Sequence, residues 1–227
     1  MPHYVFESDE DGNIARILKD GQPHNQSVHL EQLYSIVTVY FRLASEHLGR
    51  MAALQDRNAR RCAGLQSFLM GLTGLEAFTN TFFHLRAQEL KSEEMMVRIA
   101  QTHGSLSRKI IDLIAMAPDG PLVDQEVLLD RIFELSQLRN EIVHPRWTPS
   151  ALTIAGEVSV NIMGLVENRQ AMFEDEALCQ EALLWSLLAV ARIGQARGYQ
   201  ELSGFMFHWT GNYGLTLGVI TSQLGIP

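Results

Sequence analysis

Residues 124–145 read DQEVLLDRIFELSQLRNEIVHP, and their apolar positions recur at steps of three and four residues. That spacing is typical of an amphipathic helix, because it gathers the apolar side chains on one face. We expect the helix to begin near Asp124. We expect it to stop near Pro145, because the residue before a proline is pushed away from helical geometry. This stretch predicts one helix of a larger helical core.

The same helical spacing recurs on both sides of this stretch. It predicts helices over residues 30–48 (after Ser27 as a cap), 62–90, 93–101, 106–116 and 175–197. Two short apolar runs at residues 4–7 and 14–18, separated by an acidic turn with a glycine, predict a β-hairpin. Residues 146–173 fit neither pattern well, so we expect a long loop that could include a strand.

No repeat, linker or low-complexity tract divides the chain. We therefore expect one domain over residues 1–227, mainly α-helical, built as an antiparallel helical bundle with a small N-terminal β-hairpin. Its expected parts are a hairpin appendage at 1–22, the core bundle at 28–145, the loop at 146–173 and C-terminal helices at 174–227.

Composition limits the classes of function. The formal net charge is −8 over 227 residues, which argues against a surface coated with basic residues for nucleic acid but allows a local basic patch. Cys62 and Cys179 lie in apolar helical stretches, so we expect two buried thiols in a reducing compartment rather than a disulfide. The start of the sequence lacks the features of a secretory signal, which favours the cytoplasm.

The last part of the sequence carries no charged side chain from residue 202 to 227. A membrane-spanning helix needs about 20 mostly apolar residues, and polar residues and glycines interrupt this segment. We expect it to dock on the domain or on a second subunit, with no membrane contact. Its aromatic residues could stack on bases, but packing in a core or interface is the simpler interpretation.

A cation and an acid occupy unusual positions in two of the predicted helices. Arg139 falls within the apolar stripe of the helix over 124–145, where an unpaired charge would cost several kcal/mol. Glu76 lies at the centre of the stripe of the helix over 62–90, with Asn80 one turn later. We predict that Glu76 meets Arg139, either as an ion pair that sets the helix register or as part of a polar site.

A histidine and a group of arginines complete the candidate residues. His144 stands at the end of its helix, where the partial negative charge of the helix C terminus favours a protonated imidazole. Arg57, Arg60, Arg61 and Arg146 are candidate contacts to RNA, although a solvated helix start is the commoner role for such a cluster.

The string LRNEIVHP at residues 138–145 resembles the signature of the HEPN superfamily, which is an arginine and a histidine a few residues apart, with an asparagine directly after the arginine. Residues 135–137 and the helix around residues 74–80 also resemble segments of uncharacterised bacterial members. The resemblance covers about residues 30–145 and could include the helix that begins at Asp175. The hairpin and the uncharged C-terminal segment lie outside it.

The resemblance implies a helical bundle, usually a homodimer, in which the motifs of two subunits face one cleft. Active members are metal-independent endoribonucleases, many of them toxins or defence effectors, so an antitoxin protein is an expected partner. Arg139 would hold the scissile phosphate. His144 would serve as acid or base for attack by the 2′-hydroxyl of the RNA. Asn140 would orient His144 or the phosphate, and Glu76 and Asn80 would support the site.

Helix geometry restricts how this site can form. Arg139 and His144 are about 140° apart on an ideal helix, so they cannot both face one phosphate from a single straight helix. Either the helix is distorted before Pro145 or the two residues come from different subunits. Asn140 and His144, four residues apart, share a face in either case.

Other chemistries have less support in the sequence. The eight histidines show neither the helical spacing nor the cysteine partners of zinc sites, so we expect no metal and no cofactor. No serine-hydrolase, P-loop or dinucleotide motif is present. Two classes therefore remain, an endoribonuclease and a non-catalytic helical module that binds RNA or a protein partner.

Overall fold

The structure, a computed structural model, describes residues 4–8, 14–25, 35–101, 104–144, 172–211 and 215–226. The chain divides into two compact units, Met1–Gln32 and Leu33–Pro227. The sequence predicted one domain with the hairpin as an appendage. The strands of that hairpin fall in the first unit, where they pair with one another in a single sheet.

The first unit is an antiparallel sheet in the order β1-β2-β3. β1 (Tyr4–Ser8) pairs with β2 (Ile14–Lys19), which pairs with β3 (Gln22–Pro23). Asp20 and Gly21 both have positive φ, 52° and 79°, which is the backbone of a tight turn that favours Asp-Gly. The predicted hairpin is confirmed, and the two-residue third strand is an addition that was too short to predict.

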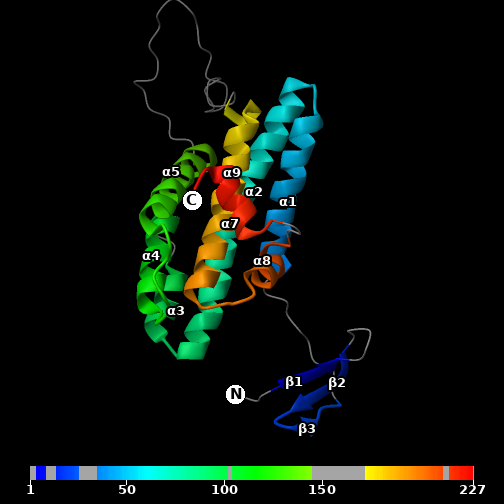
Figure 1. Cartoon of the computed structure of the whole chain (residues 1–227), viewed down its shortest axis with the longest axis vertical. Helices are drawn as coiled ribbons and strands as arrows, with labels where there is room; N and C mark the ends of the chain where they lie inside the picture. Colours follow the sequence, from blue (N-terminus) through cyan, green and yellow to red (C-terminus); the bar gives the residue numbers. More distant parts are fainter. Residues whose placement is uncertain are drawn as a thin grey trace, which may run out of the picture. The chain divides into compact units, whose positions relative to one another are not determined.

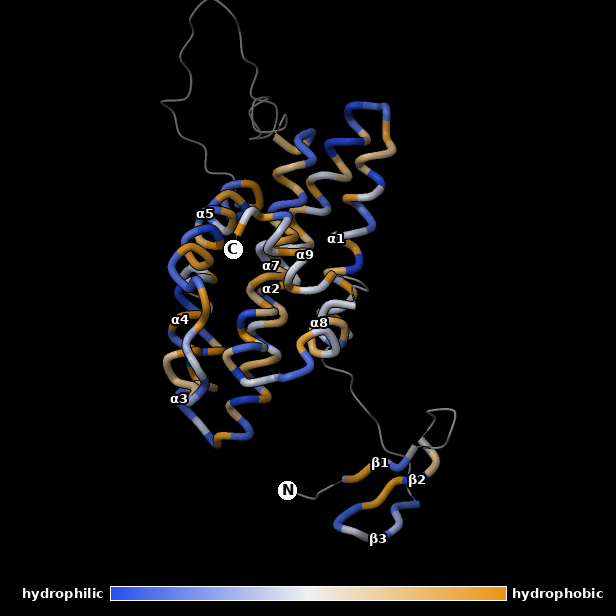
Figure 2. The backbone as a smooth tube through the Cα atoms, in the orientation of Figure 1, coloured by the Kyte–Doolittle hydropathy of each residue, from blue (hydrophilic) through white to orange (hydrophobic). Residues whose placement is uncertain are grey.

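The second unit is a helical bundle, as predicted (Figure 1). Its elements are α1 (Ser35–Ala53), α2 (Arg57–Leu90), α3 (Glu93–Ala100), α4 (Leu106–Met116), α5 (Gln125–Val143), the 3-10 helix η2 (Met172–Glu174), α7 (Glu176–Ala196), α8 (Leu202–Thr210) and α9 (Leu217–Leu224). α2 packs against α1 and α7, and α5 packs against α4 and α7. In Figure 2, hydrophilic and hydrophobic residues alternate along the tubes of α1 and α5, as expected for helices that bury one face.

Side-chain caps explain where several helices begin. Ser92 and Ser105 accept hydrogen bonds from the backbone N–H groups three residues later, both at 3.2 Å, so α3 and α4 start where the sequence predicted. α2 begins at Arg57 rather than near Cys62, because the Asp56 carboxylate accepts a hydrogen bond from the N–H of Ala59 at 2.7 Å. The predicted loop and strand at 146–173 fall almost entirely outside the described residues, as does the predicted cap at Ser27.

The core of the bundle is centred on α7, where every residue from Ala182 to Gly194 is buried. Among the described residues, α7 is the one helix long and apolar enough to cross a membrane, but 78% of its apolar window is buried inside the bundle. Glycines let the neighbouring helices approach closely. A Cβ on Gly74 would lie 3.2 Å from the Phe41 ring, and one on Gly71 would lie 3.4 Å from the Leu183 Cα. α7 is thus the core helix of this bundle.

The uncharged C-terminal segment docks on the bundle. Phe205 and Trp209 of α8 are buried and make edge-to-face contacts with Phe78 of α2, with ring centroids 6.2 and 5.1 Å apart. The predicted docking on the domain is confirmed for these residues. Phe207 is exposed, and Tyr213 lies outside the described residues.

One expectation about the thiols is wrong. Cys179 is buried and free, as predicted, and burial raises its pKa to about 12. Cys62 is also free but exposed, because it lies on the outer side of the first turns of α2. The apolar composition around Cys62 did not reveal which way its side chain points.

Candidate functional site

The motif residues lie at the C-terminal end of α5. The helix runs without interruption to Val143. His144 then leaves helical geometry, with φ −123° and ψ 67°, while its N–H still donates to the Asn140 carbonyl oxygen at 2.8 Å. The predicted stop before Pro145 is confirmed. Since α5 is continuous through Arg139, no helix distortion within the described residues turns His144 toward it.

Arg139 is paired with Glu76, as the two helical wheels predicted. The Arg139 Nη1 donates to Glu76 Oε2 at 2.9 Å, which joins α5 to α2. The side chains are 26% and 43% exposed, respectively, so the pair adds about 1 kcal/mol or less to stability. Among the described residues, Nε and Nη2 of Arg139 have no hydrogen-bond partner. One edge of the guanidinium is therefore anchored and the other remains available.

Lys109 of α4 is a second cation beside Glu76, and the sequence analysis missed it. Its Nζ donates to the carbonyl oxygens of Ile99 at 2.6 Å and Gln101 at 3.3 Å, at the end of α3. Burial, followed by the charge of Arg98, lowers the Lys109 pKa, and the nearby Glu76 carboxylate partly opposes this. Lys109 adjoins buried Ile110 on α4, a charge at the edge of an apolar stripe that could have indicated it.

Two buried polar atoms lie one helical turn from this ion pair. Asn80 follows Glu76 by four residues on α2, and its Oδ1 is buried with no hydrogen-bond partner among the described residues. Ser136 precedes Arg139 by three residues on α5, and its Oγ is also buried with no hydrogen-bond partner among the described residues. A buried unpaired polar group costs about 1–3 kcal/mol. The Asn80 oxygen can accept a hydrogen bond from a ligand or water beside the ion pair, and the Ser136 hydroxyl can donate or accept one.

His144 and Asn140 are both exposed, away from the contact of Arg139 with α2. Among the described residues, no hydrogen bond joins the side chains of Asn140, His144 and Arg139. The structure thus brings Glu76 and Arg139 together and leaves His144 and Asn140 on a different face of α5. A single subunit, as far as it is described, does not direct the arginine and the histidine to one point.

The arginines at the start of α2 pair with Glu174 of η2 and Glu176 of α7. Arg57 donates to Glu174 at 2.7 Å, and Arg61 also bonds this carboxylate. The hydrogen bond from Arg57, together with that from Arg61, lowers the Glu174 pKa. Arg60 lies 3.6 Å from Glu176. These carboxylates offset the positive charge that an RNA contact would use.

That role therefore stays a prediction for Arg57, Arg60 and Arg61. Arg146 lies outside the described residues, so the structure does not bear on it.

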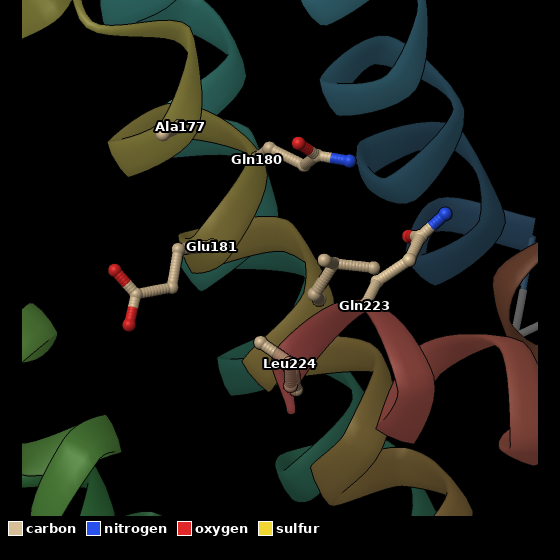
Figure 3. Close-up of a pocket in the computed structure, with 6 residues that line it drawn as sticks. Ala177, Gln180, Glu181, Gln223 and Leu224 are labelled. Atoms are coloured by element: carbon tan, nitrogen blue, oxygen red, sulfur yellow. The ribbon is translucent and has the colours of Figure 1, made fainter. Parts of the chain in front are cut away.

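A hollow of about 240 Å³ lies between α7 and α9 (Figure 3). It is lined in part by Gln180, Glu181 and Gln223 and contains none of the predicted site residues. Glu181 already accepts hydrogen bonds from Arg131 at 2.6 Å and from the Trp185 indole at 3.1 Å. Its carboxylate therefore links α5 to α7. In the described ranges, no group of three or more His, Cys, Asp or Glu side chains is arranged to hold a metal ion.

No protein-family model, curated protein or solved structure matches this chain.

Proposed function

We propose that this chain is a metal-independent endoribonuclease of the HEPN type that acts in the cytoplasm as a homodimer. The observation that carries the proposal is the state of Arg139, which Glu76 holds by one nitrogen while Nε and Nη2 keep no partner among the described residues. A guanidinium anchored on one edge and open on the other suits a phosphate, because it is already oriented.

The other motif residues take complementary roles. His144 is exposed at the end of the same helix and would act as acid or base for attack by the 2′-hydroxyl of the RNA on the adjacent phosphate. Asn140, one turn earlier, would orient the imidazole or the phosphate. Because Arg139 and His144 lie on different faces of α5, each phosphate would meet the arginine of one subunit and the histidine of the other.

Cleavage of RNA in the presence of EDTA tests the activity. We expect the full chain to cleave mixed RNA, and the His144→Ala variant to be slower by about 100-fold or more, the usual contribution of a general acid or base. His208→Ala is the matched control, since His208 is an exposed histidine in the last turn of α8. Equal rates for the wild type and the His144 variant would refute the proposed role.

Mixing two inactive variants tests the composite site. If the arginine and the histidine come from different subunits, a dimer of one Arg139→Ala chain and one His144→Ala chain retains one intact site out of two. Equal mixing with full exchange makes half of the dimers mixed, so about a quarter of wild-type activity should return. No recovery, with exchange verified by differently tagged chains, would contradict a site shared between subunits.

A non-catalytic module that binds RNA or a protein partner is the second candidate. The ion pairs favour it, because Arg57, Arg61 and Arg139 each already contact a carboxylate, which weakens the attraction for phosphate. Equal inertness of the wild type and the His144→Ala variant would support this module. If the nuclease is active, we propose that it acts as a toxin or defence effector and that an antitoxin protein is its partner.

A further inference from the structure

Four side chains of α5 form an exposed stripe that leads to His144. Phe133, Gln137, Asn140 and His144 follow one another at steps of four, three and four residues, so they lie on one side of the helix. All four are exposed. His144 continues the path of the helix, because its N–H still bonds the Asn140 carbonyl oxygen.

Phe133 is unusual in this stripe because it is a large apolar ring in contact with solvent. It is 44% exposed, although burying a phenylalanine side chain normally stabilises a protein. Its ring contacts no other aromatic ring among the described residues. Phe207 of α8, 39% exposed, is the other exposed phenylalanine among the side chains described.

The length of the stripe suits a short stretch of nucleic acid. With a helical rise of 1.5 Å per residue, Phe133 lies about 16 Å from His144 along the axis, and Gln137 about 10 Å from it. A strand whose phosphate is held at His144 can therefore present a nearby base to Phe133. The glutamine amide between them can donate to and accept from a base edge.

The charges on α5 limit where such a strand can run. Glu134, next to Phe133, is paired with Arg131 at 2.5 Å. Beyond Phe133, toward the start of the helix, the same side carries Glu126 and Asp130, both exposed and without an ion pair among the described residues. These carboxylates repel phosphates, so a bound strand would leave the helix at Phe133.

We propose that Phe133 stacks on an unpaired base of the bound RNA and that Gln137 contacts the edge of that base. This inference rests on the RNA site of the proposed function. Bases in a duplex are already stacked and paired, so an isolated ring on a convex helix can reach only an unpaired base.

Binding of a 2′-O-methyl oligonucleotide tests this proposal without cleavage, because the probe lacks the attacking hydroxyl. A single-stranded probe containing 2-aminopurine should bind the full chain with a change in its fluorescence. Phe133→Ala should weaken binding about ten-fold and abolish that change, since stacking contributes this order of affinity. Phe133→Trp should restore both, whereas Phe207→Ala, the matched control, should leave both unchanged. A blunt duplex should bind the wild type and Phe133→Ala equally.

Several results would overturn the inference. One is that Phe133→Ala binds the single-stranded probe as tightly as the wild type. Others are that Phe207→Ala loses as much affinity as Phe133→Ala, that Phe133→Ala loses as much affinity for the duplex as for the single strand, and that no probe binds. Dissociation of the homodimer by Phe133→Ala, measured by light scattering, would assign the ring to a protein interface instead. If His144→Ala abolishes cleavage but Phe133→Ala leaves binding unchanged, the role of Phe133 is refuted and the proposed nuclease is not. If Phe133→Ala weakens binding but no cleavage depends on His144, the proposed nuclease is refuted and the contact of Phe133 with a base is not.

Discussion

Replacing Phe78 with alanine is expected to lower the free energy of unfolding by about 4 kcal/mol, the usual cost of deleting a large buried ring. Phe78 is fully buried. It stacks on Phe82, with centroids 5.2 Å apart, and contacts Phe205 and Trp209 edge-to-face. These rings join α2 to α8, so their loss leaves a cavity that rigid helices close only in part. Urea denaturation followed by circular dichroism measures the effect.

Phe207→Ala is the control for this prediction. Its ring is also on α8 but is exposed, so the same deletion should change stability by about 0.5 kcal/mol. Similar losses for both variants would show that α8 does not pack on α2 as described. The comparison therefore tests the docking of the uncharged C-terminal segment as well as the size of the cavity effect.

Replacing Asp119 with alanine is expected to lower the free energy of unfolding by about 3 kcal/mol, because it leaves a buried cation without its buried partner. Arg86 donates from Nη2 to Asp119 at 2.7 Å, and the two side chains are 10% and 9% exposed. Burial alone would lower the Arg86 pKa, but hydrogen bonds to Glu89 and Asp119 outweigh burial and raise the pKa above its ordinary value. Urea denaturation at neutral pH measures the loss.

Glu89→Ala is the matched control, since Glu89 also bonds Arg86, at 2.8 Å, but is 57% exposed. Its removal should cost about 1 kcal/mol or less, because solvent replaces the lost contact. A double variant, Asp119→Ala with Arg86→Met, should recover part of the stability, since it removes the unpaired charge as well. Equal costs for the two single variants would contradict the assigned burial of this pair.

The charge balance around the candidate site bears on both proposed functions. Glu76 lies near cations on two helices, Arg139 of α5 and Lys109 of α4. A phosphate that approaches Arg139 would compete with one carboxylate and benefit from the second cation. This arrangement favours weak contact with free phosphate and stronger contact where an RNA strand makes several interactions at once.

The sequence by itself determined the features that depend on neighbours within one helix. The steps of three and four residues predicted α3, α4 and α5 and the core helix α7, because helical periodicity is a local property. Pro145 predicted the end of α5, and an arginine on an apolar stripe predicted a partner, since a buried charge without one is costly. The position of Glu76 on its own stripe then identified that partner, because few acids lie among the apolar residues of a helix.

Only the tertiary structure decided which surfaces meet. The bonds of Arg57 and Arg61 to Glu174 join residues more than 100 positions apart, and the approach of Lys109 to Glu76 depends on how α4 packs beside α2. The exposure of Cys62 and Phe133 follows from which helices leave a face uncovered. A local pattern can mark a candidate such as Lys109, but it does not show which residue the candidate meets, because a long-range contact arises from the packing of whole helices and not from the spacing of residues within one.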